Sequence, residues 1–338
     1  MSNQLVIRFG SLGDLCVLGW SLARLADATA PNRPRVTLVT KTVWADLAWK
    51  FRGVDRVVAP EGGGAVAVMK MASALRNDPY DRVIDAHNVM RSHLLLGMMG
   101  RRPDARLAKD TAARLAFIRF GRPSPKLDVT MRDRFDGLFP EIGSGENPPT
   151  EPPLIHLASQ AGSPPAEAPL GLAPGAQWST KRWPDNKFND LVKSFLETSF
   201  GRVRIFIGPR EEAWFADSPL AALAQFEPTG RVEIVRDNTL LEIAAGLAEC
   251  RRLVTNDSGL LHLAEAVGTP VTALFGPTVR EFGYFPQLPT SRVLETELDC
   301  RPCSRNGKKA CHRGDLACLD RITVDDVLAA LDGGKELA

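Results

Sequence analysis

The chain of 338 residues is 44% apolar and 24% charged, with a formal net charge of +2. Its length suits two domains better than one, and its composition is that of a protein that can bury full cores. No segment approaches the roughly 18 consecutive apolar residues of a membrane span, and the N-terminus lacks the basic and apolar regions of a secretory signal. The sequence therefore favours a cytoplasmic protein.

Charge is unevenly distributed along the chain. Residues 1–150 contain 22 Lys+Arg and 15 Asp+Glu, whereas the remainder contains 20 and 25. The basic excess peaks between Arg91 and Lys126, with nine basic and two acidic residues. This segment is either a solvated face or a surface for an anionic partner, such as a phosphorylated glycolipid or lipid headgroups. Nucleic acid is disfavoured, because the chain has only two Tyr and no zinc-finger or RNA-recognition motif.

The first half of the chain alternates between strand-like and helix-like segments. Strands are predicted over 5–9, 36–40, 54–60 and 81–87, and helices over 15–28, 44–52, 65–75 and from about residue 91. This alternation with short turns predicts a parallel sheet that is covered by helices on both faces.

A stretch rich in Pro, Ala and Ser separates the first half from a second α/β pattern. It predicts an interdomain linker over 151–173, with one strand inside it over 154–158. Strands are then predicted over 202–208, 231–235, 252–257 and 270–276, and the strand over 270–276 is expected to be the last of the chain. Helices are predicted over 188–199, 211–225, 240–248 and 261–267. The fold class is therefore α/β, with two Rossmann-like parallel-sheet domains over 1–150 and 174–338 that face a central cleft.

The first predicted strand runs into a short glycine loop, Gly10-Ser11-Leu12-Gly13-Asp14. It is neither the G-x-G-x-x-G dinucleotide fingerprint nor a P-loop, which disfavours a dehydrogenase. The loop should lie at the carboxyl edge of the sheet, where its glycines let a ligand approach the backbone. Asp14 either caps the following helix or faces the cleft as a general base.

The segment PGAQWSTKRWP (174–184) brings hydroxyl groups and a lysine to the start of a predicted helix. Ser179, Thr180 and Lys181, together with the helix N-terminus, suit the oxygens of a phosphate. The alternative is a polar loop that is capped by a packed tryptophan.

Two further motifs follow strands of the second half. In TNDSGLLHLAEAVGTPVTALFGPT (255–278), Asp257 can accept from ribose hydroxyls, and Ser258 and Gly259 start a helix whose amides suit a diphosphate. His262, on the first turn of that helix, is either structural or part of the same site. In GPREE (208–212), one of the two glutamates contacts the nucleoside end of a ligand, or both are solvated helix charges.

Four cysteines lie within 19 residues near the C-terminus: Cys300, Cys303, Cys311 and Cys318. Four thiolates close a tetrahedral zinc site without an open position, so a metal here would be structural rather than catalytic. The spacing is not that of a standard zinc finger. Reduced thiols and disulfides are the alternatives.

Taken together, these motifs resemble glycosyltransferase family 9, the ADP-heptose:lipopolysaccharide heptosyltransferases. The resemblance spans nearly the whole chain and rests on VIRFGSLGD (6–14), VIDAHNVMRS (83–92), PGAQWSTKRWP (174–184), IGPREE (207–212) and the segment 255–278. The last segment is the most specific, and its combination with the N-terminal SLGD argues against a chance match. A C-x-P-C…C…C segment also occurs in many members of this family.

The resemblance implies a GT-B fold, with the acceptor on the N-terminal domain and the nucleotide-sugar donor on the C-terminal domain. It also implies an inverting transfer that requires no metal or other cofactor. Asp14 matches the proposed catalytic base, and Lys181 matches the lysine that contacts the donor phosphates, with Ser179 and Thr180 beside it. Glu212 matches a carboxylate that contacts the nucleoside. The segment that wraps the ribose and diphosphate is matched by Asp257, Ser258, Gly259, Leu260 and His262.

On this basis we expect transfer of heptose from ADP-heptose to a lipopolysaccharide inner-core acceptor, in the cytoplasm and with peripheral contact to the inner membrane. Such an acceptor is anionic, which gives the basic excess of the N-terminal half a role. Candidate acceptor contacts are Arg91, Ser92, Arg101 and Arg102.

One segment departs from the family pattern. His87 and Asn88 stand where family members usually have a Gln-Gly-like pair, so the acceptor stays open. The alternatives are the same fold and mechanism with another nucleotide sugar or surface-glycan acceptor, and a nucleotide-binding protein without catalysis.

Overall fold

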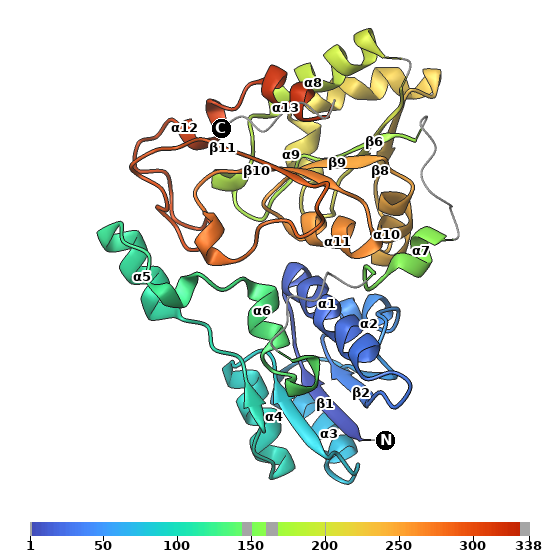
Figure 1. Cartoon of the computed structure of the whole chain (residues 1–338). Coiled ribbons are helices and arrows are strands. Elements are labelled where there is room, and N and C mark those ends of the chain that lie inside the picture. The colour runs from blue at the N-terminus through green and yellow to red at the C-terminus, as the bar shows by residue number, and fades with distance from the viewer. Residues whose placement is uncertain (1, 144–150, 160–167, 200, 332–338) are drawn as a thin grey trace. The chain divides into compact units, whose positions relative to one another are not determined.

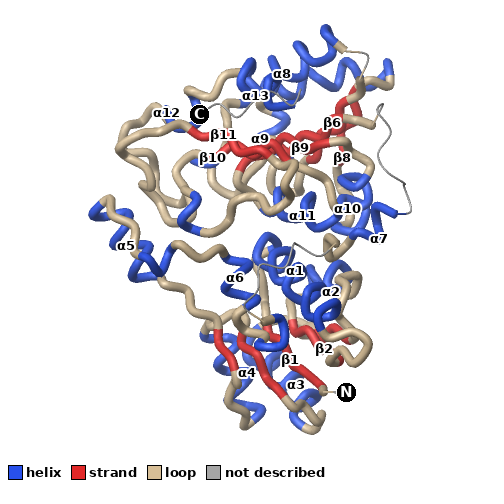
Figure 2. Tube along the Cα trace, in the orientation of Figure 1, coloured by secondary structure: helices blue, strands red, loops and turns tan. Residues whose placement is uncertain are grey.

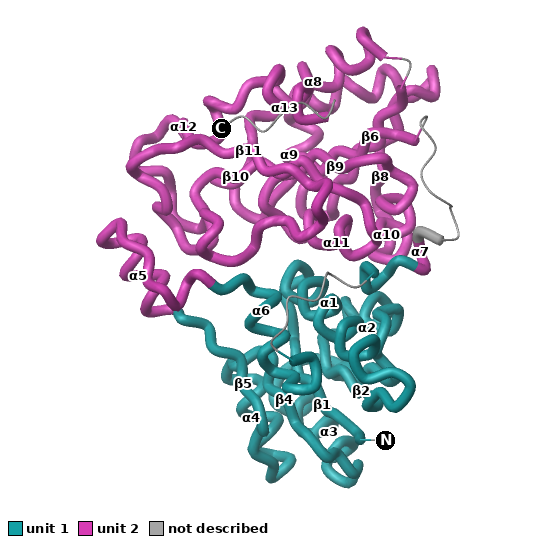
Figure 3. Tube along the Cα trace, viewed as in Figure 1, with its two compact units in different colours: residues 1–110, 129–155 teal, residues 111–128, 156–338 magenta. Residues whose placement is uncertain are grey.

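The chain folds into two compact units, each of which is described here by itself. The computed structural model describes residues 2–143, 151–159, 168–199 and 201–331. Unit 1 comprises residues 1–110 and 129–155, and unit 2 comprises residues 111–128 and 156–338 (Figure 3). Among the described residues, no helix has the length and apolar character that crossing a membrane requires.

Unit 1 contains a five-stranded parallel sheet in the order β3-β2-β1-β4-β5. Its strands are β1 (Asn3–Ile7), β2 (Arg35–Val39), β3 (Arg56–Val58), β4 (Arg82–Asp85) and β5 (Ala105–Arg106). Its helices are α1 (Leu12–Ala28), α2 (Thr42–Ala48), α3 (Gly64–Arg76), α4 (Met90–Met99), α6 (Met131–Asp136) and the 3₁₀ helix η2 (Pro140–Ile142) (Figure 1). The central strand β1 is buried from Gln4 onward, as expected for a strand that is covered on both faces.

Unit 2 contains a six-stranded parallel sheet in the order β11-β10-β9-β6-β7-β8 (Figure 2). Its strands are β6 (Leu170–Ala173), β7 (Val203–Phe206), β8 (Val232–Val235), β9 (Arg252–Asn256), β10 (Val271–Phe275) and β11 (Arg292–Glu295). Helices α8 (Asp185–Thr198) and α13 (Val324–Leu331) cover one face of the sheet, and α10 (Leu240–Ala248) and α11 (Gly259–Val267) cover the other (Figure 1). The shorter elements are α9 (Glu212–Ala216), α12 (Ala317–Asp320), η3 (Ser179–Lys181), η4 (Pro219–Thr229) and η5 (Arg280–Phe282).

Both sheets reverse their direction of winding once, and each reversal defines a crevice at the carboxyl ends of two neighbouring strands. In unit 1 the chain runs outward from β1 through β2 to β3, and β4 then pairs with the other side of β1. In unit 2 the same reversal separates β6 from β9. Ligands of open α/β sheets bind at such switch points. The loops that follow β1, β4, β6 and β9 are therefore the places to look for a site.

Most predicted strands and helices are present, but several elements differ from the prediction or were not predicted. Residues 154–158, predicted as a strand, fall largely in the helix α7 (Ile155–Ser159). The predicted helix over 211–225 is divided into α9 and η4, because Pro219 cannot continue a helix. The short strand β5 was not predicted, and β11 follows the strand that was expected to be last.

The compact units also differ from the predicted domains at two places. The strand β6 lies inside the predicted linker 151–173, although it pairs with both β7 and β9 and starts the second sheet. Residues 111–128, predicted within the first domain, belong to unit 2. There α5 (Thr111–Phe120) packs against η5, with the Phe117 and Phe282 rings edge to face at 6.4 Å and Arg114 donating to the Phe282 carbonyl. Residues 144–150, just before that linker, and residues 160–167, within it, lie outside the described residues.

Candidate active site

Asp14 lies in the first turn of α1, directly after the glycine loop that follows β1. Its Oδ2 atom accepts hydrogen bonds from the backbone N–H and the hydroxyl of Ser11, at 3.2 and 2.9 Å. The Nη2 atom of Arg8 lies 2.6 Å from the same oxygen. Ser11 is therefore the N-cap residue of α1, and Asp14 supports this helix start from its third position while it is also ion-paired. Its side chain keeps 15% of its surface exposed.

Arg8 is a charged residue of this site that the sequence analysis missed. The residue is only 4% exposed, and its Nη1 atom donates to the carbonyl of Ala86 at 2.6 Å. Its guanidinium also lies 5.3 Å from the centroid of the Phe135 ring. An arginine directly after an otherwise apolar strand was the available signal, because a buried charge requires partners. Arg8 links the loop after β1 to the turn after β4.

The turn after β4 presents His87 at the switch point of the first sheet. The fully buried Asp85 accepts from the backbone N–H groups of His87 and Asn88, at 3.2 and 2.7 Å. The Nδ1 atom of His87 accepts from the N–H of Phe9 at 3.3 Å, which assigns the ring proton to Nε2. Burial and the nearby Arg8 charge lower the pKa of His87 to about 4. The ring is therefore neutral at physiological pH.

Gly10 is required by its conformation and by the approach of Trp44. Its φ of +126° is one that L side chains rarely adopt, and a Cβ there would lie 2.9 Å from the indole Nε1 of Trp44. Gly13 is buried within α1, and Ser11 is exposed. The glycine loop thus packs closely against α2 rather than forming an open cradle.

The four candidate acceptor contacts differ in how accessible they are. Ser92 is fully buried, and its hydroxyl both accepts from the Val89 N–H and donates to the Val89 carbonyl. Arg101 donates to the carbonyl of Tyr80 at 2.7 Å. These two side chains therefore hold the fold of unit 1. Arg91, 5.6 Å above the Phe9 ring, and Arg102 are exposed.

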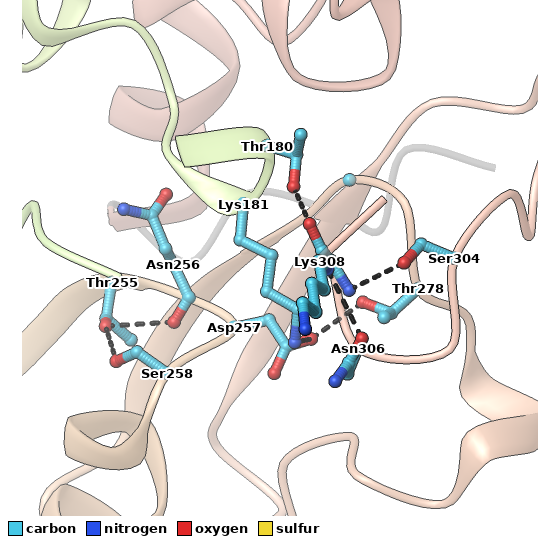
Figure 4. Close-up of polar contacts among 12 residues, drawn as sticks. Thr180, Lys181, Thr255, Asn256, Asp257, Ser258, Thr278, Ser304, Asn306 and Lys308 are labelled. Atoms are coloured by element: carbon cyan, nitrogen blue, oxygen red, sulfur yellow. Dashed lines mark hydrogen bonds and ion pairs between the residues drawn. The ribbon is translucent and has the colours of Figure 1, made fainter. Parts of the chain in front are cut away.

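The second polar cluster surrounds an ion pair between Lys181 and Asp257 at the β6–β9 switch point of unit 2 (Figure 4). Lys181 lies in η3, after β6, and its Nζ is 2.5 Å from Oδ2 of Asp257, directly after β9. The hydroxyl of Thr278 donates to the same oxygen at 2.7 Å. Burial alone would raise the pKa of Asp257, but Lys181 and Thr278 outweigh it and hold the pKa below its usual value. Asp257 is therefore a carboxylate with a matched positive partner.

Asn256, which sequence analysis did not single out, fixes the loop that carries Lys181. Its side-chain amide donates to the carbonyl of Pro174 at 2.7 Å, and its Oδ1 accepts from the backbone N–H of Trp183 at 2.9 Å. Both ends of the segment 174–183 are thereby tied to the last residue of β9. Asn256 and Trp183 are buried, so these bonds form away from water and hold Lys181 over Asp257.

The start of α11 faces the same region. Ser258 occupies the N-cap position, but its side chain makes no capping bond and instead lies 3.4 Å from the hydroxyl of Thr255. The amide groups of Gly259 and Leu260 therefore begin the helix without a side-chain cap, at the positive end of its dipole. His262 is 5% exposed, packs 6.0 Å from the Tyr284 ring, and contributes to the lowered pKa of Asp257. It is both structural and adjacent to the cluster.

Of the two glutamates in GPREE, Glu211 is the one that reaches the loops around the cluster. Its Oε2 accepts from the backbone N–H of Gly208 at 3.0 Å, and its carboxylate lies against Gly175, where a Cβ would be 1.9 Å from Oε1. Burial raises the pKa of Glu211. Glu212 begins α9, and its Oε1 is buried without a hydrogen-bond partner among the described residues.

Of the three alternatives for the four C-terminal cysteines, the structure shows free thiols. Cys300, Cys303, Cys311 and Cys318 are all free thiols. Within the described part of the chain, no group of three or more His, Cys, Asp or Glu side chains has an arrangement that could hold a metal ion.

Two doubly wound parallel-sheet units, each with polar residues at its switch point, define the class of this protein: it has the GT-B fold of glycosyltransferases. A sequence profile of glycosyltransferase family 9 (heptosyltransferase) matches residues 68–312, well over half of the chain. The chain belongs to this family.

Individual relatives agree with this assignment. Lipopolysaccharide heptosyltransferase 1 of Pseudomonas aeruginosa is 28% identical over 248 residues, which are 70% of this chain and 64% of the relative. Lipopolysaccharide heptosyltransferase 2 of Salmonella typhimurium is 33% identical over 119 residues, 35% of this chain and 34% of the relative. The chain thus matches between about a third and two thirds of the length of these relatives.

Solved structures resemble the chain over nearly its whole length. E. coli ADP-heptose lps heptosyltransferase II superposes with a TM-score of 0.72 at 21% identity, covering 98% of both chains. E. coli heptosyltransferase WaaC with ADP-2-deoxy-2-fluoro heptose superposes with a TM-score of 0.69 at 20% identity, covering 98% of this chain and 99% of the other. At these identities the likeness establishes the fold.

We predict that His87 makes the stability of the protein depend on pH. Its pKa is about 4 when folded against an ordinary value of 6.5, so the unfolded state binds more protons between these values. Stability is therefore fully present above pH 6.5 and is lost as pH falls toward 4. Allowing for the partial exposure of the ring, wild type should lose up to about 1 kcal/mol more than His87→Gln between pH 7 and pH 5.

Urea unfolding at pH 7, 6 and 5 measures this difference. His312→Gln, which changes an exposed histidine, is the matched control and should keep the pH dependence of wild type. Equal pH dependence of wild type and His87→Gln would contradict the assignment.

Proposed function

We propose that this family 9 glycosyltransferase moves a heptose from ADP-heptose to a lipopolysaccharide inner-core acceptor, with inversion and without a metal. Relatives named lipopolysaccharide heptosyltransferases support the substrates. A similar structure that holds ADP-2-deoxy-2-fluoro heptose supports an ADP-linked donor. The observation that carries the proposal is the Lys181–Asp257 cluster at the switch point of the second sheet.

The chemistry of this cluster suits a nucleoside diphosphate. Lys181 supplies a cation, and the amides of Gly259 and Leu260 supply uncapped donors at a helix start. Asp257, as an ionised carboxylate, can accept hydrogen bonds from ribose hydroxyls. As the sugar leaves, negative charge develops on the diphosphate, and fixed cationic and amide groups would stabilise it without a metal. Ser179, Thr180 and His262 complete this proposed donor site, with Glu212 at the nucleoside.

Asp14 is the proposed general base on the acceptor side. An acceptor hydroxyl must lose its proton as its oxygen attacks the anomeric carbon, and a carboxylate can take that proton. The ion pair with Arg8 suits a side chain that carries a negative charge, and the capping bond to Ser11 fixes its position. Inversion follows when the hydroxyl attacks from the face opposite to the leaving diphosphate.

The proposal also includes the acceptor and the cellular location. The exposed Arg91 and Arg102 remain candidates for contact with an anionic acceptor. A lipopolysaccharide acceptor is itself anchored in a membrane, so we include a cytoplasmic enzyme with peripheral contact to the inner membrane in the proposal.

We predict that the protein selects ADP-sugars over UDP- and GDP-sugars. Isothermal titration calorimetry with ADP-heptose, ADP-glucose, UDP-glucose and GDP-mannose measures this, each with and without EDTA. ADP-heptose should bind at least about tenfold more tightly than the UDP and GDP compounds, a difference of about 1.4 kcal/mol, and EDTA should have no effect. Preference for a UDP- or GDP-sugar would show that ADP-heptose is not the donor, and it would leave the proposed fold and mechanism unchanged.

We also predict that Asp14→Asn abolishes most turnover while ADP binding persists. Removal of a general base should lower kcat by about 10²–10⁴-fold, because the amide cannot take the proton although it can still accept the hydrogen bonds that cap α1. Asp46→Asn, in an exposed position on α2, is the control. If Asp14→Asn retains turnover, Asp14 is not the base. If Asp14→Asn no longer binds ADP, the substitution has damaged the structure.

A further inference from the structure

The loop Ser304–Lys309, inside the cysteine-rich segment, lies directly beside the proposed donor site (Figure 4). It is ordered by its own side chains: the buried Ser304 hydroxyl accepts from the N–H of Gly307 at 3.0 Å, and Asn306 accepts from the N–H of Lys308 at 3.2 Å. These bonds form a compact turn with a defined shape. Its position in the fold is therefore informative.

This loop contacts Thr180 and Lys181, the lysine that is proposed to bind the donor phosphates. The hydroxyl of Thr180 donates to the carbonyl of Gly307. The Lys181 side chain packs so closely on Gly307 that a Cβ there would lie 2.7 Å from its Cγ, and Gly307 has a φ of +84°. Only glycine permits both the conformation and the contact. The C-terminal loop thus packs directly against the Lys181 side chain.

Lys308 brings a second ammonium group to this place. Its Nζ lies 5.8 Å from the centroid of the Trp178 ring, one residue before η3. Figure 4 draws Lys308 next to Gly307, the residue on which the Lys181 side chain packs. Asp257 is already paired with Lys181, and Lys308 forms no ion pair with a carboxylate among the described residues. The cluster therefore has an excess of positive charge that an anion would neutralise.

We propose that Lys308 is a second phosphate-binding residue for the diphosphate of the donor, supplied by the cysteine-rich segment. This inference rests on the proposed function, because it assigns a residue of the same site. Lys181 approaches the ligand from the loop after β6, and Lys308 approaches it from the C-terminal loop. Two cations from separate segments would share the charge that develops as the diphosphate leaves the sugar. Gly307 serves as a positioning residue that lets the C-terminal loop approach Lys181 closely.

Calorimetry with ADP and with adenosine, on the full chain, tests the assignment. Lys308→Gln should weaken ADP binding about tenfold, since a charge-assisted hydrogen bond to phosphate is lost, and Lys308→Arg should restore most of it. Adenosine, which has no phosphate, should bind all variants equally. The difference for ADP should shrink at 1 M NaCl. Lys309→Gln, at the adjacent exposed lysine, is the matched control and should bind ADP like wild type.

The outcomes separate this inference from the function on which it rests. Wild type that binds neither ADP nor ADP-heptose would defeat both. Wild type that binds ADP, with Lys308→Gln equal to it, would overturn the role of Lys308 alone. Equal losses for ADP and adenosine would also overturn it, because they would indicate a structural role. Gly307→Ala should weaken ADP but not adenosine, because the added Cβ displaces Lys181.

A different observation concerns the outer face of α5, which is independent of the donor site. One side of this helix packs against η5 through Arg114 and Phe117, which are 8% and 7% exposed. The opposite side carries Ala112, Leu115, Ala116, Arg119 and Phe120, all exposed. At 100° per residue they fall within an arc of about 140°. Leu115 is 52% and Phe120 71% exposed, so the outer face of the helix is largely apolar.

The charged residues on α5 and in the loop that follows it are basic, and the acidic Asp110 and Asp128 stand at the two ends of this segment. Between residues 111 and 127 the chain has four basic residues and no acidic one. Arg119, Arg122 and Lys126 are exposed, and the Arg119 guanidinium lies 5.7 Å from the centroid of the Phe120 ring. Exposed apolar side chains flanked by arginine and lysine match the interface of a bilayer with anionic headgroups.

We infer that the outer face of α5 docks on an anionic phospholipid bilayer, with Leu115 and Phe120 entering the interface. Arg119, Arg122 and Lys126 would bind the headgroup phosphates. Covalent anchoring is not needed, because apolar burial and electrostatic attraction act together. The site for a lipid surface then belongs to unit 2, although its residues lie in the first half of the chain.

Co-sedimentation with vesicles tests this docking. Wild type should bind phosphatidylcholine vesicles that contain phosphatidylglycerol, and less so at 0.5 M NaCl. The double variant Leu115→Ser/Phe120→Ser should have a membrane partition coefficient about tenfold lower than that of wild type. The double variant Arg119→Gln/Arg122→Gln should lose the preference for vesicles that contain phosphatidylglycerol. Val66→Ser with Met69→Ser, exposed by 59% and 53% on α3, is the matched control.

The control should bind like wild type, and all variants should keep their affinity for ADP. Failure of wild type to bind the anionic vesicles, or an equal loss in the α3 control, would overturn the assignment of α5. Vesicle binding by the variant Leu115→Ser/Phe120→Ser with the affinity of wild type would also overturn it.

Discussion

The parallel pairing of β6 with β9 is the constraint on which the proposed donor site depends. These two strands meet where the second sheet reverses its winding, so the loops that follow them diverge and leave a crevice. Asn256, at the end of β9, then ties both ends of the segment 174–183 to itself. The Lys181–Asp257 ion pair is a consequence of this arrangement, since the two residues come from loops that are 76 positions apart in sequence.

The same principle places Asp14 in unit 1. β1 and β4 are neighbours at the other switch point, and Arg8 crosses between the loops that follow them. The carboxylate that caps α1 is therefore also part of a charged network with the turn of Asp85 and His87. A residue can hold a helix start and present a carboxylate at a sheet edge, because both tasks require it at the first turn of α1.

Sequence reasoning identified most of the strands, the loops after them and most of the polar residues at their ends. These features have local signals: alternating elements, glycine turns, and hydroxyl or charged residues directly after an apolar run. It did not identify Arg8, Asn256 or the loop Ser304–Lys309 as neighbours of the site. Their contacts join residues that are far apart in the chain, as in the bond from Thr180 to Gly307, and no periodicity reports such a pairing. It also left the state of the four cysteines open between a metal site, free thiols and disulfides, because spacing in the sequence does not show how the thiols are arranged in space.

The sequence by itself determined the class of fold, the family resemblance and the identity of Asp14, Lys181 and Asp257 as candidates. Motif chemistry is encoded in short segments, and a short segment keeps its meaning before the chain folds. Only the tertiary structure decided that β6 belongs to the second sheet, that α5 packs in unit 2, and that the cysteine-rich loop packs directly against Lys181. Those outcomes depend on which distant surfaces bury each other, and burial is a property of the whole packed chain rather than of any window of its sequence.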